Sequence, residues 1–267
     1  DSCDPVKGCL AAPSAAACDD KNPCTDDVCD KVKGCSNTPK VGCAAGLPYN
    51  QPFNCNDPSL ADWKFDAPNN KVGWAVDDSP NPPGFRSAAC SLNYNNGATF
   101  NSGGTNSGNA TSPQLDATAA KPNAPIVVEF WVSGSGEGGN PYDALTLEAS
   151  LDDQTWTPLV IETGAKVIPP PGNTAWAKHT ASLSAYAGKK FRLRFHFDTV
   201  DGIANDFAGP FVDDVLVYDP SCGKDADCDD KSGCTTDTCN AATGKCVFAP
   251  LVCDDKSACT TDQCDAV

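Results

Sequence analysis

Residues 191–197 read FRLRFHF, a strict alternation of apolar and polar side chains. Successive side chains of a β-strand point to opposite faces of its sheet, so the four apolar side chains would face a core. The polar side chains, including His196, would face solvent, which makes His196 a surface residue rather than a catalyst. Residues 145–151, LTLEASL, show the same alternation. Both stretches predict half-buried strands.

The same pattern extends over the centre of the chain. From Ala44 to Tyr218, short alternating apolar runs are separated by stretches rich in Gly, Asn, Ser and Pro. This is typical of an all-β sandwich. We therefore predict an all-β fold: a jelly-roll sandwich at residues 44–221, flanked by small, loop-dominated, disulfide-rich repeats at residues 1–43 and 222–267. Only the central segment is long enough to bury its own core.

The cysteines support this division. Of the 17 cysteines, seven fall in residues 1–43, eight in residues 222–267 and two between them. Zinc sites favour cysteine pairs two to four residues apart with help from histidine. Here the spacings are mostly five, and His179 and His196 lie far from the clusters. Disulfides and an oxidising compartment follow, so we expect a secreted or cell-surface protein.

We expect all of the cysteines to form disulfides: Cys3, Cys9, Cys18, Cys24, Cys29, Cys35, Cys43, Cys55, Cys90, Cys222, Cys228, Cys234, Cys239, Cys246, Cys253, Cys259 and Cys264.

Net charge excludes one class of partner. The chain has 35 acidic and 19 basic residues, for a formal charge of −16, which would repel a phosphate backbone. Nucleic acid is therefore not an expected partner. No apolar run approaches the roughly 20 residues of a membrane-spanning helix, so we expect no membrane span in this segment.

Three segments align without gaps, namely CDDKNPCTDDVC from Cys18, CDDKSGCTTDTC from Cys228 and CDDKSACTTDQC from Cys253. They are tandem repeats, too poor in apolar residues to form a core. Their shape should come from disulfides and from polar side chains bonded to the backbone. The sequence begins inside such a unit and stops at Val267 inside another, so we expect a piece of a longer polypeptide, such as a fibre subunit.

The pattern C-x5-C-T-x-D-x-C, followed by G-C, resembles the CTDC-type cysteine repeat of slime moulds, which is also frequent in large surface proteins of predatory myxobacteria. The resemblance covers the two flanks. It implies an extracellular stalk or matrix segment rather than an enzyme.

A series of phrases in the centre resembles MAM-like jelly rolls, including those appended to secreted bacterial proteases. These phrases are ADWKF and VGWAV, then ACSLNYNNG, TSPQLDAT, VVEFWV, ALTLEASLDDQTWTPL and WAKHTASLSAYAGKKFRLRFHFDTVD, and finally GPFVDDVLV. Related jelly rolls often hold a structural calcium between their first and last strands. The resemblance implies such a site here, with Asp57 or Asp62 early and Asp213 or Asp214 late as candidate ligands.

Two further arguments concern calcium. Strand alternation places Asp213 and Asp214 on opposite faces, where an unpaired carboxylate on the core side is costly and a metal would neutralise it. Separately, a second oxygen-rich set lies within nine residues: Asp198, Asp201, Asn205 and Asp206. The alternative for this set is ordinary turn-forming side chains in a solvated loop.

Disulfide pairing near the sandwich stays open. Because the ends of such a domain usually lie close together, Cys43 or Cys55 could be bridged to Cys222. The rival pairing joins Cys55 to Cys90.

Catalytic patterns are weak. The sequence contains neither an HExxH motif nor a G-x-S-x-G elbow with a suitable histidine, and Asp152 and Asp153 fall in an expected hairpin turn. We therefore predict a non-catalytic structural or adhesive segment of a larger protein, with copies of itself or adjoining domains as partners. The alternative is a carbohydrate-binding or protein-binding accessory module of a secreted hydrolase, with glycans or surface proteins as partners.

Overall fold

The structure is a computed structural model. It describes residues 2–4, 8–10, 25–30, 34–39, 44–66, 72–78, 85–87, 89–95, 97–137, 142–168, 172–222, 224–240 and 245–251. Two compact units divide the chain, Asp1–Ala44 and Ala45–Val267. Among the described residues no helix is long and apolar enough to cross a membrane.

The first unit contains two antiparallel hairpins, for which the backbone is described. Strand β1 (Ser2–Asp4) pairs with β2 (Gly8–Leu10), and β3 (Thr25–Asp30) pairs with β4 (Gly34–Pro39). The register of each hairpin sets two cysteines opposite one another, Cys3 with Cys9 and Cys29 with Cys35. The two hairpins therefore place the same cysteine positions of the repeat in the same way.

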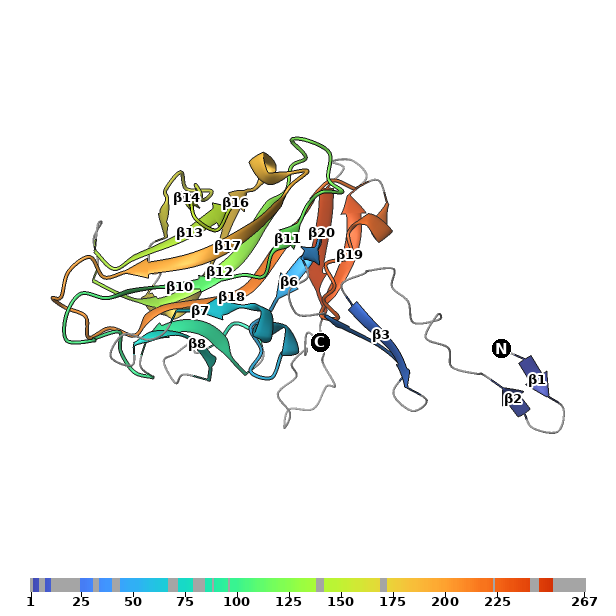
Figure 1. Cartoon of the computed structure of the whole chain (residues 1–267), viewed down its shortest axis with the longest axis horizontal. Helices are drawn as coiled ribbons and strands as arrows, with labels where there is room; N and C mark the ends of the chain where they lie inside the picture. Colours follow the sequence, from blue (N-terminus) through green and yellow to red (C-terminus); the bar gives the residue numbers. More distant parts are fainter. Residues whose placement is uncertain are drawn as a thin grey trace. The chain divides into compact units, whose positions relative to one another are not determined.

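The second unit contains a sandwich of two sheets (Figure 1). One sheet has the order β14 (Thr157–Pro158), β13 (Ala144–Ser150), β17 (Lys190–Asp198), β10 (Ser107–Thr111), β7 (Lys64–Phe65), with β11 (Leu115–Asp116), β5 (Ala45–Gly46) and β15 (Val167–Ile168) attached. The other has the order β16 (Gly172–Ser182), β12 (Val127–Ser135), β18 (Gly209–Tyr218), β9 (Ser91–Asn95), β8 (Gly73–Asp77), with β6 (Tyr49–Gln51) on β18. Short 3-10 helices occupy Pro58–Asp62 (η1) and Ser184–Tyr186 (η2). The fold is all-β, as the alternation predicts.

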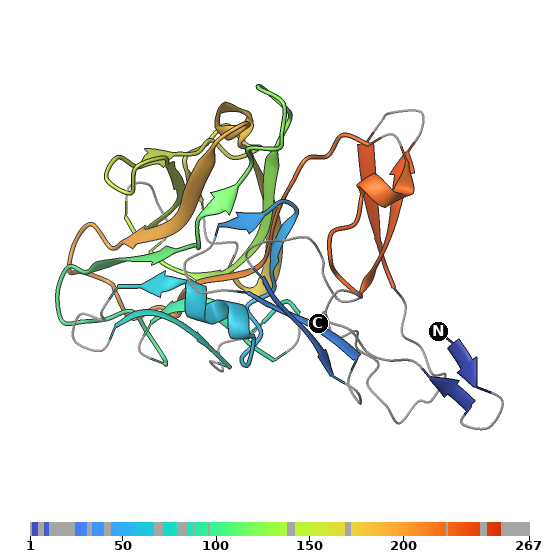
Figure 2. The same cartoon turned by 45° about the vertical axis from the view of Figure 1, so that its right-hand side comes forward.

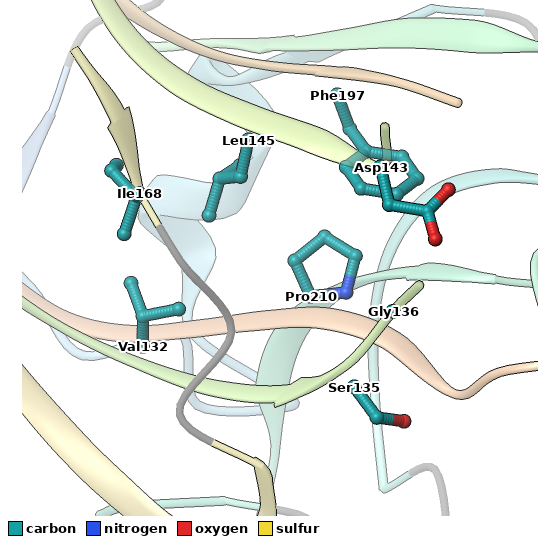
Figure 3. A pocket seen from close by; sticks show the side chains of 8 residues that line it. All are labelled: Val132, Ser135, Gly136, Asp143, Leu145, Ile168, Phe197 and Pro210. Carbon is teal, nitrogen blue, oxygen red and sulfur yellow. The ribbon is translucent and has the colours of Figure 1, made fainter. Parts of the chain in front are cut away.

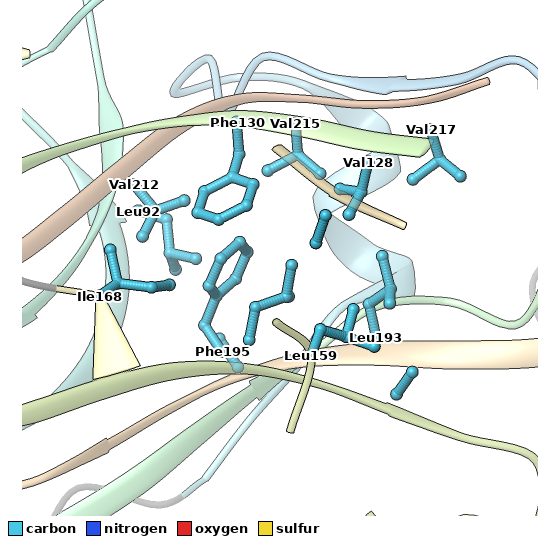
Figure 4. Close-up of a cluster of buried hydrophobic side chains, with 14 of the residues drawn as sticks. Leu92, Val128, Phe130, Leu159, Ile168, Leu193, Phe195, Val212, Val215 and Val217 are labelled. Carbon is cyan, nitrogen blue, oxygen red and sulfur yellow. The ribbon is translucent and has the colours of Figure 1, made fainter. Parts of the chain in front are cut away.

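The core lies between the two sheets. All four apolar side chains of residues 191–197 are at most 2% exposed, whereas the polar ones between them are half-buried. Phe195 of β17 meets Phe130 of β12 edge to face, with ring centroids 5.4 Å apart. Figure 4 shows these two rings pointing toward one another from opposite strands. Burial of such side chains, about 1.5–3 kcal/mol each, is what holds the sandwich together.

Two glycines allow a close approach between β12 and β18. Gly134 has a φ of +114°, and a Cβ built there would collide with the carbonyl oxygen of Gly209, whose own φ is +83°. The register of β12 with its neighbours shifts at two places, between Glu129 and Trp131 on the β18 side and between Val132 and Gly134 on the β16 side. β-bulges at these places re-aim the side chains that follow.

A small cystine-built unit follows the sandwich. It consists of a 3-10 helix at Asp225–Asp227 (η3) and a hairpin of β19 (Thr235–Asn240) and β20 (Lys245–Pro250), visible in orange in Figure 2. None of its described side chains belongs to the apolar cluster of the sandwich. Disulfides join Cys222 to Cys239 and Cys228 to Cys246. Cross-links therefore replace an apolar core in this unit.

Candidate functional site

A β-bulge in β18 positions the carboxylate pair that the sequence marks. Asp213 lies opposite Trp131, and the register shifts directly after it. Asp214 takes a φ of +48°, in the left-handed region. Simple alternation is broken at this point, so the two carboxylates do not lie on opposite faces in the way a regular strand would place them. Asp213 is completely buried and Asp214 is half-buried.

The pair holds the loop at residues 85–87 against the sheet. One oxygen of Asp213 accepts hydrogen bonds from the backbone N–H groups of Arg86 (2.7 Å) and Ser87 (3.1 Å). The other accepts from the N–H of Asp214 at 2.9 Å, and Asp214 accepts from the Ser87 hydroxyl at 2.6 Å. Burial raises the pKa of both carboxyls, and the charge of Asp214 raises that of Asp213 further. The charge of Arg86 acts in the opposite direction and lowers the pKa of Asp214. A further cation beside the pair would add to this effect.

Asn93 and Asp77 extend this oxygen-rich cluster. The register of β18 with β9 sets Phe211 opposite Asn93, so Asn93 shares a face with Asp213, two residues along. The Asn93 amide nitrogen donates to Asp77 at 2.7 Å, while its carbonyl oxygen, fully buried, has no partner within the described residues. Carboxylate and amide oxygens suit calcium, so the donor set fits that ion. Sequence reasoning missed Asn93, because its neighbour Phe211 is far away in the chain.

Asp57 and Asp62, the early candidate ligands, lie at the two ends of η1. Asp57 caps η1, where its side chain accepts from the Ser59 N–H at 2.8 Å, and burial raises the pKa of Asp62 at the other end of that helix. Both charges act on Tyr49 and raise its pKa, an effect secondary to burial. Within the described part of the chain, no hydrogen bond links Asp57 or Asp62 to Asp213 or Asp214, and no three carboxylates have oxygens within 4.8 Å of one another.

The second predicted set is divided between turns and a buried amide. Asp198 accepts from the Val200 N–H at 2.8 Å and Asp201 from the Ile203 N–H at 2.9 Å. Asp206 is exposed and accepts from the Asn101 side chain at 2.7 Å. Asn205, in contrast, is buried. The three carboxylates therefore each close a local turn or tie a neighbouring loop.

A small pocket opens between the sheets near these loops. Figure 3 shows its lining: Val132, Ser135, Gly136, Asp143, Leu145, Ile168, Phe197 and Pro210. Its empty space is about 230 Å3, including the part open to solvent. Its lining is mostly apolar, which does not suit a sugar, and the buried carboxylate of Asp143 at its rim is the exception.

The outer face of the β13–β17–β10 sheet is polar. Arg194 contacts Glu148, and its guanidinium lies 4.3 Å from the ring centre of Trp156. His196 is half-buried and alternates with the buried Phe195 and Phe197, so it lies on the outer face of β17, where it bonds to the Asn109 side chain at 2.9 Å. These side chains come from three neighbouring strands and the turn after β13. The face thus offers charged, amide and aromatic groups side by side.

The carboxylates of the hairpin turn after β13 do not form an acid–base pair. Asp152 accepts hydrogen bonds from the N–H groups of Thr155 and Gln154, which lower its pKa to about 2. Asp153 pairs with Arg192 at 3.1 Å. Both side chains are thus committed to the turn and to an ion pair.

The disulfides settle one open choice and correct another. Cys55 is bonded to Cys90, so this rival pairing is the one in the structure. The predicted bridge from Cys43 or Cys55 to Cys222 is wrong, because Cys222 is bonded to Cys239 of the repeat. Three sulfurs, those of Cys222, Cys228 and Cys246, lie within 4.8 Å of one another, but each is in a disulfide and not free to bind zinc.

The remaining cysteines divide into three groups. Cys234 is also disulfide-bonded. The side chains of Cys3, Cys9, Cys29 and Cys35 are not described, and Cys18, Cys24, Cys43, Cys253, Cys259 and Cys264 lie outside the described residues.

Comparison with known families identifies the flanks. A family described as the Dictyostelium (slime mold) repeat matches residues 17–40, 227–251 and 252–267. The cysteine-rich segments on both sides of the sandwich therefore carry this repeat, as the spacing predicts. No curated protein matches the chain.

Solved structures similar to the chain come from several kinds of protein. The CBM22-1 xylan-binding domain of Xyn10C from Paenibacillus barcinonensis is 12% identical, with a TM-score of 0.35 over 66% of this chain and 96% of that domain. The K3 cleaved adhesin domain of Lys-gingipain from Porphyromonas gingivalis is 17% identical, with a TM-score of 0.35 over 64% and 98%. An arabinose-bound α-L-arabinofuranosidase, MgGH51, is 15% identical, with a TM-score of 0.40 over 66% and 26%. Similarities this distant identify no ligand for this chain.

Proposed function

We propose that the chain is a non-catalytic structural and adhesive segment of a larger secreted or cell-surface protein, stabilised by disulfides and calcium. The observation that carries this proposal is the direct continuation of β18 into the cystine-built repeat. β18 lies inside its sheet, between β12 and β9, and ends at Tyr218. A force applied to the repeat would therefore reach the interior of the sandwich rather than an edge strand.

Contacts between the end of β18 and the hairpin of β19 and β20 support such a transmission of force. The Tyr218 ring meets the Phe248 ring edge-on, with centroids 5.1 Å apart. The N–H of Cys246 donates to the carbonyl oxygen of Pro220 at 3.0 Å, and Ser221 bridges to Lys245. The next residue, Cys222, is cross-linked to β19. Covalent, hydrogen-bonded and aromatic contacts thus connect the last strand to the hairpin within a few residues.

Matching repeats on both sides of the sandwich support a connecting role. A unit that lacks an apolar core of its own gains by packing on a neighbour, as repeat proteins do. The neighbours would be further copies of the chain or adjoining domains of a longer polypeptide, and a filament is the extended form of that arrangement.

A bead-clustering assay tests adhesion directly. Beads coated with the disulfide-intact chain should cluster in millimolar calcium, and an excess of the soluble chain should disperse them. Beads coated with an unrelated protein of similar charge are the control. Absence of clustering, together with a monomer at all concentrations in sedimentation, would contradict self-association.

The calcium part of the proposal concerns the Asp213–Asp214 pair with Asn93. Thermal melting of the chain should shift upward from chelator to millimolar calcium, and the isosteric substitution Asp214→Asn should reduce that shift. Equal melting temperatures of the wild type with and without calcium would exclude the ion.

A second candidate function is glycan binding on the outer face around Trp156. The observation that favours it is the stacking of Arg194 on Trp156 beside Glu148, because aromatic rings flanked by polar groups suit the apolar faces and hydroxyls of sugars. Binding on a glycan array should then be lost in Trp156→Ala and kept in Lys178→Ala, which alters the opposite sheet. A chain that binds no glycan would remove this candidate without affecting the structural role.

A further inference from the structure

Asp143 is a buried carboxylate at the loop end of the sandwich, directly before β13. It is 3% exposed, and its backbone takes a φ of +52°. One of its oxygens accepts a hydrogen bond from the Glu137 N–H. The other is buried and has no partner within the described residues. Figure 3 shows the carboxylate directed away from Leu145 and the other apolar side chains of the pocket.

Asn205 presents a second buried oxygen without a partner. It lies in the loop between β17 and β18 and is 2% exposed. Its amide nitrogen faces two carbonyl oxygens, that of Asp201 at 3.3 Å and that of Gly104 at 3.4 Å. This contact fixes which end of the amide is the nitrogen, because the reverse orientation would set oxygen against oxygen. The Asn205 side-chain oxygen is left unpaired within the described residues.

The strand register places these groups in neighbouring loops at the same end of β13 and β17. Ala144 pairs with Asp198, so Asp143 lies beside the start of the loop that carries Asp201 and Asn205. Burial raises the pKa of Asp143 to about 6, and the negative charges of Glu137 and Asp201 contribute to that rise. The Asn205 amide nitrogen in turn donates to the backbone carbonyl oxygen of Asp201. The two unpaired buried oxygens therefore belong to neighbouring loops, and the Asp201 charge is close enough to act on Asp143.

We propose that Asp143, Asp201 and Asn205 form a binding site for a calcium ion. Buried polar atoms in proteins nearly always have a partner, so two unpaired oxygens near a negative charge indicate a missing positive ligand. The three donors are carboxylate and amide oxygens, without histidine or cysteine, which favours calcium over zinc. They come from loops rather than from a rigid octahedral cage, which favours calcium over magnesium.

The site is separate from the Asp213–Asp214 pair and does not depend on the adhesive role. Its ligands also differ from the set that the sequence predicts for this loop. Asp143, which no sequence pattern marks, joins Asp201 and Asn205. Asp201 also closes a turn, but its charge acts on Asp143, whereas Asp198 and Asp206 are not among the charges that do so. A bound ion would tie the connection before β13 to the connection before β18.

Calcium titration of the disulfide-intact chain by isothermal calorimetry, after removal of metal with a chelator, tests the proposal. Asp143→Asn keeps the shape and removes the charge, and it should weaken one class of calcium sites by about tenfold or more. Asp201→Asn should act in the same direction. Asp206→Asn is the matched control, because it removes an exposed carboxylate from the same loop and should leave binding unchanged.

Thermal melting gives a second measurement, because the effect of Asp143→Asn on the melting temperature should depend on whether calcium is present. In chelator, Asp143→Asn should melt no lower than the wild type, because a neutral amide replaces a buried charge. In millimolar calcium it should melt lower than the wild type. A chain that binds no calcium overturns the proposal, as does an Asp143→Asn variant that keeps full binding, or an Asp206→Asn variant that loses as much. Asp214→Asn reports on the other site, so either site can fail alone.

Discussion

Removing the Cys222–Cys239 and Cys228–Cys246 disulfides should unfold the hairpin of β19 and β20 and leave the sandwich intact. The bridges Cys222–Cys239 and Cys228–Cys246 span 17 and 18 residues. Loop-closure entropy for loops of this length corresponds to about 3 kcal/mol each, or about 6 kcal/mol for the pair. The described side chains of the repeat contribute nothing to the apolar cluster. A loss of this size has no buried core to offset it.

Hydrogen exchange on the hairpin measures the effect. In a variant with all four cysteines changed to Ala, the amides of β19 and β20 should exchange at the rate of an unfolded chain, whereas those of β12 and β17 stay protected. The matched control is Cys55→Ala with Cys90→Ala. Its loop of 35 residues implies a similar loss of about 4 kcal/mol, yet the core should keep the sandwich folded. Protected hairpin amides in the first variant would refute the view that cross-links replace a core.

Three further predictions concern the sandwich. Gly134→Ala should lower the free energy of unfolding by about 3 kcal/mol or more in chemical denaturation, because its Cβ meets backbone, whereas Gly164→Ala, with open space around it, should cost only about 1 kcal/mol. Arg194→Ala should cost about 1–3 kcal/mol by the same measurement, since it leaves Glu148, whose side chain is 9% exposed, without its cation. Asp152→Ala should lower the melting temperature at pH 6 but hardly at pH 2. A carboxyl whose pKa falls to about 2 on folding contributes its full stabilisation above its unfolded pKa and loses it as pH falls through 2.

The alternation in residues 191–197 was sufficient to predict the sheets and the side of β17 that enters the core. Alternation is a local property, and it holds wherever a strand is regular. It failed at Asp213 and Asp214, because a bulge inserts a residue there and the sequence VDDV contains no sign of it. The neighbour that completes this cluster, Asn93, comes from a strand more than a hundred residues earlier. The alternation within one strand does not indicate which residues of a distant strand lie opposite it.

Disulfide connectivity shows a similar limit. The sequence located the repeats from spacing alone, and the family match places them at residues 17–40, 227–251 and 252–267. It could not tell that Cys222 belongs to the repeat rather than to the closing of the sandwich. The register sets Cys239 opposite Cys246, yet each bonds to a different cysteine. Cysteines that face one another in a hairpin therefore do not have to be bonded to each other. For the same reason, the facing positions of Cys29 and Cys35 do not show that these two cysteines form a disulfide.

The oxygen clusters lie where regular strands give way to loops or bulges, and this placement follows from the way each part of the chain is stabilised. The core fixes β13, β17 and β18, so Asp143 and Asp213 are held at defined positions although their charges are unfavourable there. The loop that carries Arg86 is then tied to Asp213 by hydrogen bonds, and the proposed ion would tie the loop that carries Asn205 to Asp143. Core packing thus provides the energy that keeps a charge buried, and the buried charge in turn orders a loop that has little core of its own.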